Sequence, residues 1–262
     1  MKSLKHIFLS VTAFLSIASA SADYLPWSDI EKKFKEENLN SKALSHVKCF
    51  FDNYGDAVFQ KKISYSFENE NRCAGDAKIT VDKKRVFALI DYTAPSDERR
   101  MFLVDRQTGA ISMMAVAHGR FNANMFNLKL SPNKNSVKYA KYFSNELGSN
   151  APSSGFFIAG NEYEGKFGRS LTLHGLEAGI NDNACERAVV IHKHALMSQS
   201  TARAMSAGCP MIDKSYIDHV INLLQGEENL FNGEQTNGSA VFIYGPRESK
   251  WASDTCAGNF NI

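Results

Sequence analysis

Short apolar runs bounded by turn signals dominate the chain from residue 79 onward. Runs rich in β-branched and aromatic side chains pack well on a pleated sheet, so each one predicts a strand. The seven predicted strands are Arg85–Tyr92, Arg100–Arg106, Ala110–Ala117, Phe156–Ala159, Leu171–His174, Ala188–Ile191 and Ala240–Tyr244. Gln107-Thr108-Gly109 is a turn signal between the second and third runs, and it predicts a hairpin. Many short strands with few helices favour a mainly β fold, a β-sandwich or open barrel.

Helical spacing of apolar residues is found in two regions. Residues 24–60 show it near the N-terminus, and Ile212–Leu224 shows it later, with Gly226 as the stop signal. We therefore expect an N-terminal helical segment over residues 23–78 and a mainly β domain with a few helices over 79–262. The helical segment is interpreted as a cap packed on that domain.

The first residues, 1–22, have the layout of a secretory signal peptide. Two lysines precede an apolar core over Ile7–Ile17, and small residues allow cleavage near Ala20 or Ala22. The apolar core is shorter than the ~20 residues that a bilayer-spanning helix needs, and no later segment reaches that length. The mature protein is therefore expected to be periplasmic or secreted and to have no membrane span.

Charge and composition exclude several functional classes. The formal net charge of +2 comes from the two lysines of the leader, which contains no acidic residue, so nothing indicates nucleic acid as a partner. The chain has no Cys-x-x-Cys, no His-Glu-x-x-His and no compact His/carboxylate cluster, so no metal site is expected. No glycine-rich phosphate loop follows a predicted strand, and no cofactor is expected.

The stretch from Arg187 to Pro210 combines a strand, a histidine and a cysteine. Its apolar run ends at His192, and Ser206-Ala207-Gly208-Cys209-Pro210 predicts a tight turn whose Cys209 lies 17 residues after His192. A thiolate is a nucleophile, and a nearby imidazole takes the thiol proton, so the two side chains suit a Cys–His pair. From the residues alone, a buried inert cysteine and a structural histidine remain open alternatives.

This stretch resembles the catalytic domain of the L,D-transpeptidases, the YkuD-like family, in which a histidine is followed by a Ser-x-Gly-Cys turn. It is most similar to the murein L,D-transpeptidase branch, which carries Gly-Cys-Pro at the turn, as Gly208-Cys209-Pro210 does here. The similarity covers roughly residues 80–250. It includes Phe87–Tyr92, Met101–Asp105, Val116–Gly119, Gly155–Phe157, Gly165–Lys166, Leu173–Glu177, Asn181–Asn183 and Phe242–Pro246.

The resemblance implies an acyl transfer on peptidoglycan stem peptides. Cys209 attacks the carbonyl of the diamino acid that precedes a terminal D-alanine, while His192 takes the thiol proton and passes it to the leaving amine. A backbone carbonyl near the turn orients His192. Ser206 shapes the turn, and the N–H groups of Gly208 and Cys209 are candidates for stabilising the oxyanion.

Under this interpretation, the acyl-enzyme reacts with one of two acceptors. An amine gives a 3-3 crosslink or an attached protein, which is L,D-transpeptidation, whereas water gives L,D-carboxypeptidase trimming of tetrapeptides to tripeptides. A non-catalytic peptidoglycan-binding module is the alternative from another class, and it would not need Cys209. A papain-like protease is disfavoured because its cysteine precedes its histidine in the chain.

Three other histidines compete for a place in the site. His194 shares a strand face with His192 if the strand continues that far, because residues two apart point the same way. His118 and His174 are each followed by glycine but lie too far from Cys209 for the family spacing. They match positions that recur in the closer branch, so each is a candidate for lining a substrate pocket, with a structural hydrogen-bonded histidine as the equal alternative.

The chain departs from the wider family at two positions. Met211 stands where the main family has an arginine that is thought to hold a substrate carboxylate, and Ala207 stands where the closer branch tends to have tryptophan. Arg187 and Arg203 lie in the same stretch and are candidates for supplying the cation. Solvated or strand-edge arginines are the alternative for both.

Five cysteines in an exported chain leave one thiol over. If Cys209 is the nucleophile, it is the free one. Cys49 and Cys73 are then the preferred disulfide pair, and Cys185 and Cys256 either pair or stay buried.

Overall fold

The computed structural model describes residues 24–64, 73–81, 84–119, 135–202, 206–228, 235–252, 255–256 and 260. The predicted signal peptide lies outside these residues. In the described part, three α-helices accompany a sheet of eight strands and two small two-stranded sheets. The helices are α1 (Trp27–Glu36), α2 (Ser41–Tyr54) and α3 (Ile217–Leu224), with short 3-10 turns η2 (Asp182–Ala184) and η3 (Glu248–Lys250). None of the described helices is long and apolar enough to cross a membrane.

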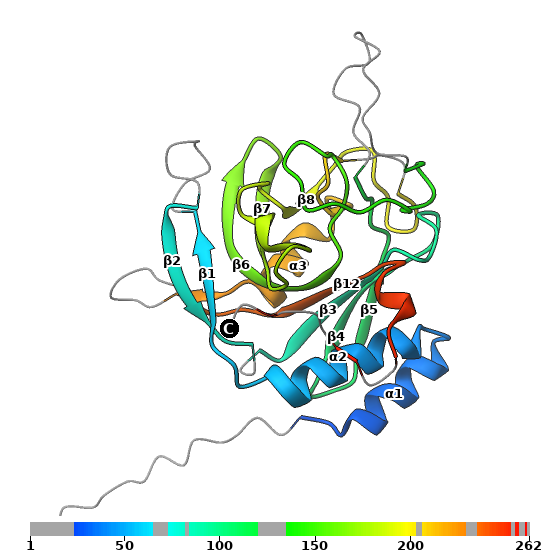
Figure 1. Cartoon of the computed structure of the whole chain (residues 1–262). Coiled ribbons are helices and arrows are strands. Elements are labelled where there is room, and N and C mark those ends of the chain that lie inside the picture. The colour runs from blue at the N-terminus through cyan, green and yellow to red at the C-terminus, as the bar shows by residue number, and fades with distance from the viewer. Residues whose placement is uncertain are drawn as a thin grey trace, which may run out of the picture.

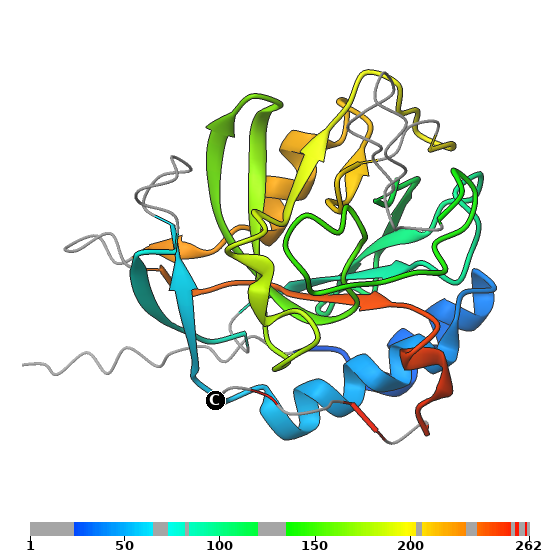
Figure 2. The ribbon, with the colours of Figure 1, turned by 45° about the horizontal axis from the view of Figure 1, so that its top comes forward.

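The large sheet contains β3 (Val86–Asp91), β4 (Met101–Asp105), β5 (Ile111–Met114), β6 (Gly155–Gly165), β7 (Gly168–Gly175), β8 (Val190–Lys193), β9 (Met211–Ile212) and β12 (Ala240–Tyr244). Its strand order is β5-β4-β3-β12-β6-β7-β8-β9, with parallel pairs at β12–β3 and β8–β9. The sheet curls until it is almost a barrel, and the β6–β7 hairpin rises from it (Figure 1, Figure 2). The expectation of a mainly β fold with few helices is confirmed.

Each face of the sheet has its own core. One core contains α3, whose buried side chains are Ile217, Val220, Ile221 and Leu224, as the helical spacing predicted. The helix starts at Ile217 and not at 212, because Met211 and Ile212 pair with β8 as strand β9. Figure 1 shows α3 between the β6–β7 hairpin and β12.

The N-terminal helices cover the other face of the sheet. Phe34 and Phe50 are fully buried there, and the Phe50 ring stacks on Phe156 of β6 with centroids 4.5 Å apart. Asn40 accepts a hydrogen bond from the N–H of Ala43 and so caps α2. The helices therefore share one core with the sheet, and α1 and α2 lie along it in Figure 1.

The expected helical segment over residues 23–78 is helical only as far as Tyr54. Strands β1 (Phe59–Ile63) and β2 (Gly75–Ile79) follow and pair with each other. They were missed because a run such as FQKKI carries few apolar residues, and only its alternating burial marks it as a strand. β10 (Glu227–Glu228) and β11 (Gln235–Asn237) were missed as well, since such short strands carry no pattern of their own.

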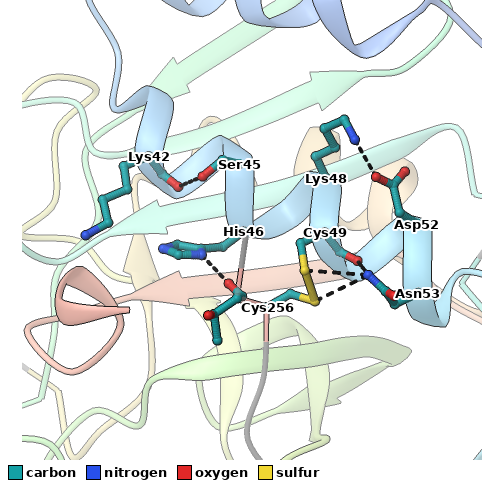
Figure 3. Close-up of a disulfide and its surroundings, with 9 residues drawn as sticks. Lys42, Ser45, His46, Lys48, Cys49, Asp52, Asn53 and Cys256 are labelled. Carbon is teal, nitrogen blue, oxygen red and sulfur yellow. Dashed lines mark hydrogen bonds and ion pairs between the residues drawn. A yellow bond between two sulfur atoms is a disulfide. The ribbon is translucent and has the colours of Figure 1, made fainter. Parts of the chain in front are cut away.

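The preferred disulfide pair, Cys49 with Cys73, is wrong. Cys49 of α2 is bonded to Cys256, with 5.2 Å between Cα atoms (Figure 3), and Cys73 is bonded to Cys185, with 5.9 Å. The physical reason is the strand β1, whose five extended residues carry the chain about 15 Å away from α2. Cys73 lies just before β2, the antiparallel partner that runs back along β1. Cys49 and Cys73 are therefore near each other in the sequence but are bonded to different partners in the structure. Cys209 is the free cysteine.

Candidate active site

The turn that carries the free cysteine is stabilised by its own serine. Ser206 Oγ accepts a hydrogen bond from the N–H of Gly208 at 3.0 Å and donates one to the carbonyl oxygen of Cys209 at 2.5 Å. Gly208 has φ +124°, and a Cβ at this position would lie 2.7 Å from the carbonyl oxygen of Ala151. Only glycine fits this backbone and this space. Because the Gly208 N–H is already bonded to Ser206, it is a poor oxyanion donor, contrary to expectation.

The residues that follow β5, Ala117 to Gly119, contact this turn. The N–H of Ser206 donates to the carbonyl oxygen of His118, and Ala117 pairs with Met211. A Cβ on Gly119 would lie 2.5 Å from Gly208 Cα, so the two backbones touch. The glycine at position 119 therefore allows the contact that holds the turn of Cys209 in place.

His118 belongs to this support and not to a substrate pocket. Its ring is fully buried; Nε2–H donates to the carbonyl oxygen of Ser136 at 2.8 Å, and Nδ1 accepts from Arg100 at 2.8 Å. Burial, followed by the charge of Arg100, lowers the pKa of His118 to about 4. Both ring nitrogens are occupied, which leaves none for a ligand and agrees with the alternative of a structural, hydrogen-bonded histidine.

Cys209 lies partly buried beside the start of β8. Its thiol donates to the carbonyl oxygen of Ala188 at 3.5 Å. Burial raises the pKa of the thiol above its ordinary value of 9.0, while the Val190 backbone and the positive charges of Arg187 and Lys166 act in the opposite direction. The resting side chain at neutral pH is therefore the thiol.

His192 lies on β8, and its backbone N–H donates to the carbonyl oxygen of Pro210, the residue that follows Cys209. Nδ1 is 3.1 Å from the carbonyl oxygen of Lys193. A carbonyl only accepts, so Nδ1 carries the proton and Nε2 keeps its lone pair. The carbonyl is that of the next strand residue and not one of the turn. Burial lowers the pKa of His192 to about 4, which keeps the ring neutral at pH 7.

Two of the candidate histidines are occupied elsewhere. His194 follows the end of β8, so the argument from strand alternation lapses, and its Nδ1 accepts the N–H of Leu196 at 3.1 Å. His174 lies on β7, and its Nε2 is 3.0 Å from Gln235 Oε1, with β11 and β1 as its surroundings. Figure 1 shows β1 on the side of the hairpin away from β8. Neither ring is held at Cys209 by a hydrogen bond.

Arg187 lies beside the turn but has little donor capacity left for a substrate. Its guanidinium donates to the carbonyl oxygens of Ser144 and Ala151 and to the hydroxyl of Ser153. Every one of these acceptors belongs to the segment that faces Gly208. Arg187 therefore clamps that segment and adds positive potential at Cys209. Arg203, the other candidate, lies outside the described residues.

The tip of the β6–β7 hairpin contributes Lys166, which lies in the Gly165–Lys166 match to the family, and Phe167, which the sequence did not single out. The Phe167 ring stacks on His192, with centroids 4.2 Å apart and planes at 17°. Lys166 precedes it and is exposed. The only signal in the sequence was the pair of glycines, Gly165 and Gly168, around a two-residue turn.

Two further observations limit what the site holds. In the part of the chain that the structure describes, no group of three or more His, Cys, Asp and Glu side chains is arranged to hold a metal ion. A cavity of about 450 Å³ has Ser144, Ser154 and Arg247 among its lining residues. Neither Cys209 nor His192 lines this cavity.

Comparisons with known proteins identify one family for this chain. The family model YkuD_2, described as the L,D-transpeptidase catalytic domain, matches residues 58–232. No curated protein matches the sequence. Two solved structures that resemble the chain are of the helical cell shape determining protein Pgp2 from Campylobacter jejuni, one of them a point mutant.

The likeness to Pgp2 is distant. The mutant has a TM-score of 0.36 at 13% identity over 76% of this chain and 55% of that chain. The other structure has a TM-score of 0.35 at 10% identity over 77% and 54%. This chain therefore spans about half the length of the Pgp2 chains.

The pKa of Cys209 predicts how alkylation of the protein depends on pH. Because burial raises the thiol pKa above 9.0 and His192 is neutral, thiolate forms only at alkaline pH. The rate of modification by iodoacetamide, followed by mass spectrometry, is expected to be still rising at about pH 9. A rate that levels off below about pH 8 would instead show a thiolate–imidazolium pair.

Proposed function

Because this chain belongs to the L,D-transpeptidase catalytic domain family, we propose that it is an exported cysteine acyltransferase acting on peptidoglycan stem peptides. The bond attacked is the one between the diamino acid and the terminal D-alanine. The observation that carries the proposal is the neutral His192 beside a turn that presents the one free cysteine.

The acylation step uses both side chains. His192 Nε2 takes the thiol proton as Cys209 Sγ bonds to the carbonyl carbon, and then gives it to the departing amine of D-alanine. The Lys193 carbonyl fixes the Nδ1–H tautomer and so leaves Nε2 as the base. The resulting thioester is resolved by an amine, which gives a 3-3 crosslink or an attached protein, or by water.

The tetrahedral intermediate needs a donor for its negative oxygen. The N–H of Cys209 is our candidate, since the N–H of Gly208 is bonded to Ser206. Loss of one such donor typically costs ~100- to 1000-fold in rate. The nearby charge of Arg187 favours the same intermediate through space.

Export is supported by the disulfides as well as by the leader-like residues 1–22. The Cys49–Cys256 and Cys73–Cys185 bonds persist in an oxidising compartment such as the periplasm. A free cysteine in that compartment is exposed to oxidation, so its retention at Cys209 fits use as a nucleophile better than use in a non-catalytic binding module.

The proposal is tested by incubating the protein with purified disaccharide-tetrapeptide and analysing the products by chromatography and mass spectrometry. Dimers joined through 3-3 bonds establish transpeptidation, the activity that we propose. Tripeptide with free D-alanine alone establishes the second candidate, L,D-carboxypeptidase trimming. Unchanged tetrapeptide together with binding to sacculi would contradict both and support a binding module.

The assignment of the base predicts a difference between two neighbouring histidines. His192→Ala is expected to slow acylation of Cys209 by ~100-fold or more, the usual contribution of a positioned base. His194→Ala is the matched control and is expected to change the rate little, because its ring accepts a backbone N–H outside the site. Single-turnover acylation rates decide between them, and equal defects would refute the assignment.

A further inference from the structure

The β6–β7 hairpin places its tip over the proposed base. The two strands pair as far as Gly165 and Gly168, so only Lys166 and Phe167 form the turn. Phe167 stacks on His192, which is 2% exposed beneath it. A group that receives a proton from His192 therefore lies near this tip, which is the free end of the hairpin in Figure 2.

Lys166 brings an uncommitted positive charge to that place. Its side chain is exposed, its ammonium lies 4.8 Å from the centre of the Phe167 ring, and no carboxylate of the described residues forms an ion pair with it. Burial is the largest influence on the pKa values of His192 and Cys209, and the charge of Lys166 lowers both. Lys166 is thus electrostatically close to both members of the pair.

The two arginines near the site are committed to other contacts, and Lys193, beside His192, is half-buried against Gly168. The donors of Arg187 bind the segment that faces Gly208, and Arg100 is fully buried with its donors on Val116, Ala94 and His118. Met211, which replaces the arginine of the wider family, is 2% exposed in an apolar cluster. Among the described residues, Lys166 is the exposed cation whose charge acts on both Cys209 and His192.

The geometry of acylation brings a negative charge to the same tip. At attack, the carbonyl carbon lies about 3–3.5 Å from Cys209 Sγ. The departing nitrogen lies within hydrogen-bond reach of His192, about 2.6–3.2 Å. In a terminal amino acid, the free carboxylate is attached to the carbon next to that nitrogen. The carboxylate therefore extends past His192, toward Phe167 and Lys166.

We propose that Lys166 binds the free carboxylate of the departing C-terminal residue and restricts the enzyme to the last peptide bond of its substrate. This inference rests on the proposed function. The chemical step is unchanged: the Sγ–C bond forms, the C–N bond breaks, and the thiol proton leaves on the amine of the released amino acid. Lys166 is a specificity-determining residue, because it contacts the leaving group without taking part in proton transfer.

The test compares two synthetic stem tetrapeptides that differ only at the C-terminus, one with a free carboxylate and one with an amide. Release of D-alanine or of D-alanine amide gives kcat/KM for each. The full-length protein is expected to prefer the acid by about tenfold, the size of one charge-assisted hydrogen bond. Lys166→Ala is expected to lose this preference by reacting more slowly with the acid only, and Lys166→Arg to retain it.

Two controls make the result specific. Lys35→Ala removes an equal charge from the exposed side of α1 and is expected to keep the preference. Lys193→Ala tests the neighbouring lysine, whose side chain lies against Gly168. Loss of the preference in Lys193→Ala, with Lys166→Ala unchanged, would overturn the assignment.

The inference and the proposed function fail in different ways. Hydrolysis of both peptides at equal rates by the unmodified protein, or the same acid preference in Lys166→Ala, would refute the role of Lys166 and leave the acyltransferase standing. Activity on neither peptide would refute the proposed function, and the role of Lys166 with it.

Discussion

The close contact between two backbones, at Gly119 and Gly208, is the constraint on which the rest of the site depends. A side chain on either residue would collide with the other segment or with Ala151. The contact allows Ser206 to bond to both sides of the turn while its own N–H bonds to His118. The turn that carries Cys209 is thereby held by backbone contacts and by the Ser206 side chain.

Burial is the largest influence on the pKa values of Cys209 and His192. It raises the pKa of the Cys209 thiol and lowers that of His192 to about 4, so both groups are neutral at rest. A neutral imidazole is ready to accept a proton, and charge appears only as the reaction proceeds. The positive charges of Arg187 and Lys166 act on Cys209 and favour its negatively charged form. Arg187 is part of the buried framework around the turn, and Lys166 is exposed to solvent. The two residues differ because the guanidinium of Arg187 already donates to Ser144, Ala151 and Ser153, whereas Lys166 forms no ion pair with a described carboxylate.

Local patterns in the sequence predicted most of the sheet and the turn that carries the free cysteine, while the reacting pair remains our proposal. Apolar runs such as Phe87–Ile90 form buried strands whatever lies beside them, and the Ser206–Pro210 turn is specified by its own glycine and serine. Contacts between distant segments were not predictable in this way. The partner of Cys49 depends on where the C-terminus packs, and the burial of His118 depends on Arg100. The stacking of Phe167 on His192 depends on the curl of a long hairpin, which no short pattern encodes.

The central claim is that Cys209 forms an acyl-enzyme, and covalent trapping tests it most directly. The protein is incubated with a carbapenem, its intact mass is measured, and the modified peptide is located by digestion. We expect a single adduct on Cys209 and none in Cys209→Ala, because the other four cysteines form two disulfides. Full labelling of Cys209→Ala, or an unmodified wild-type protein, would contradict it.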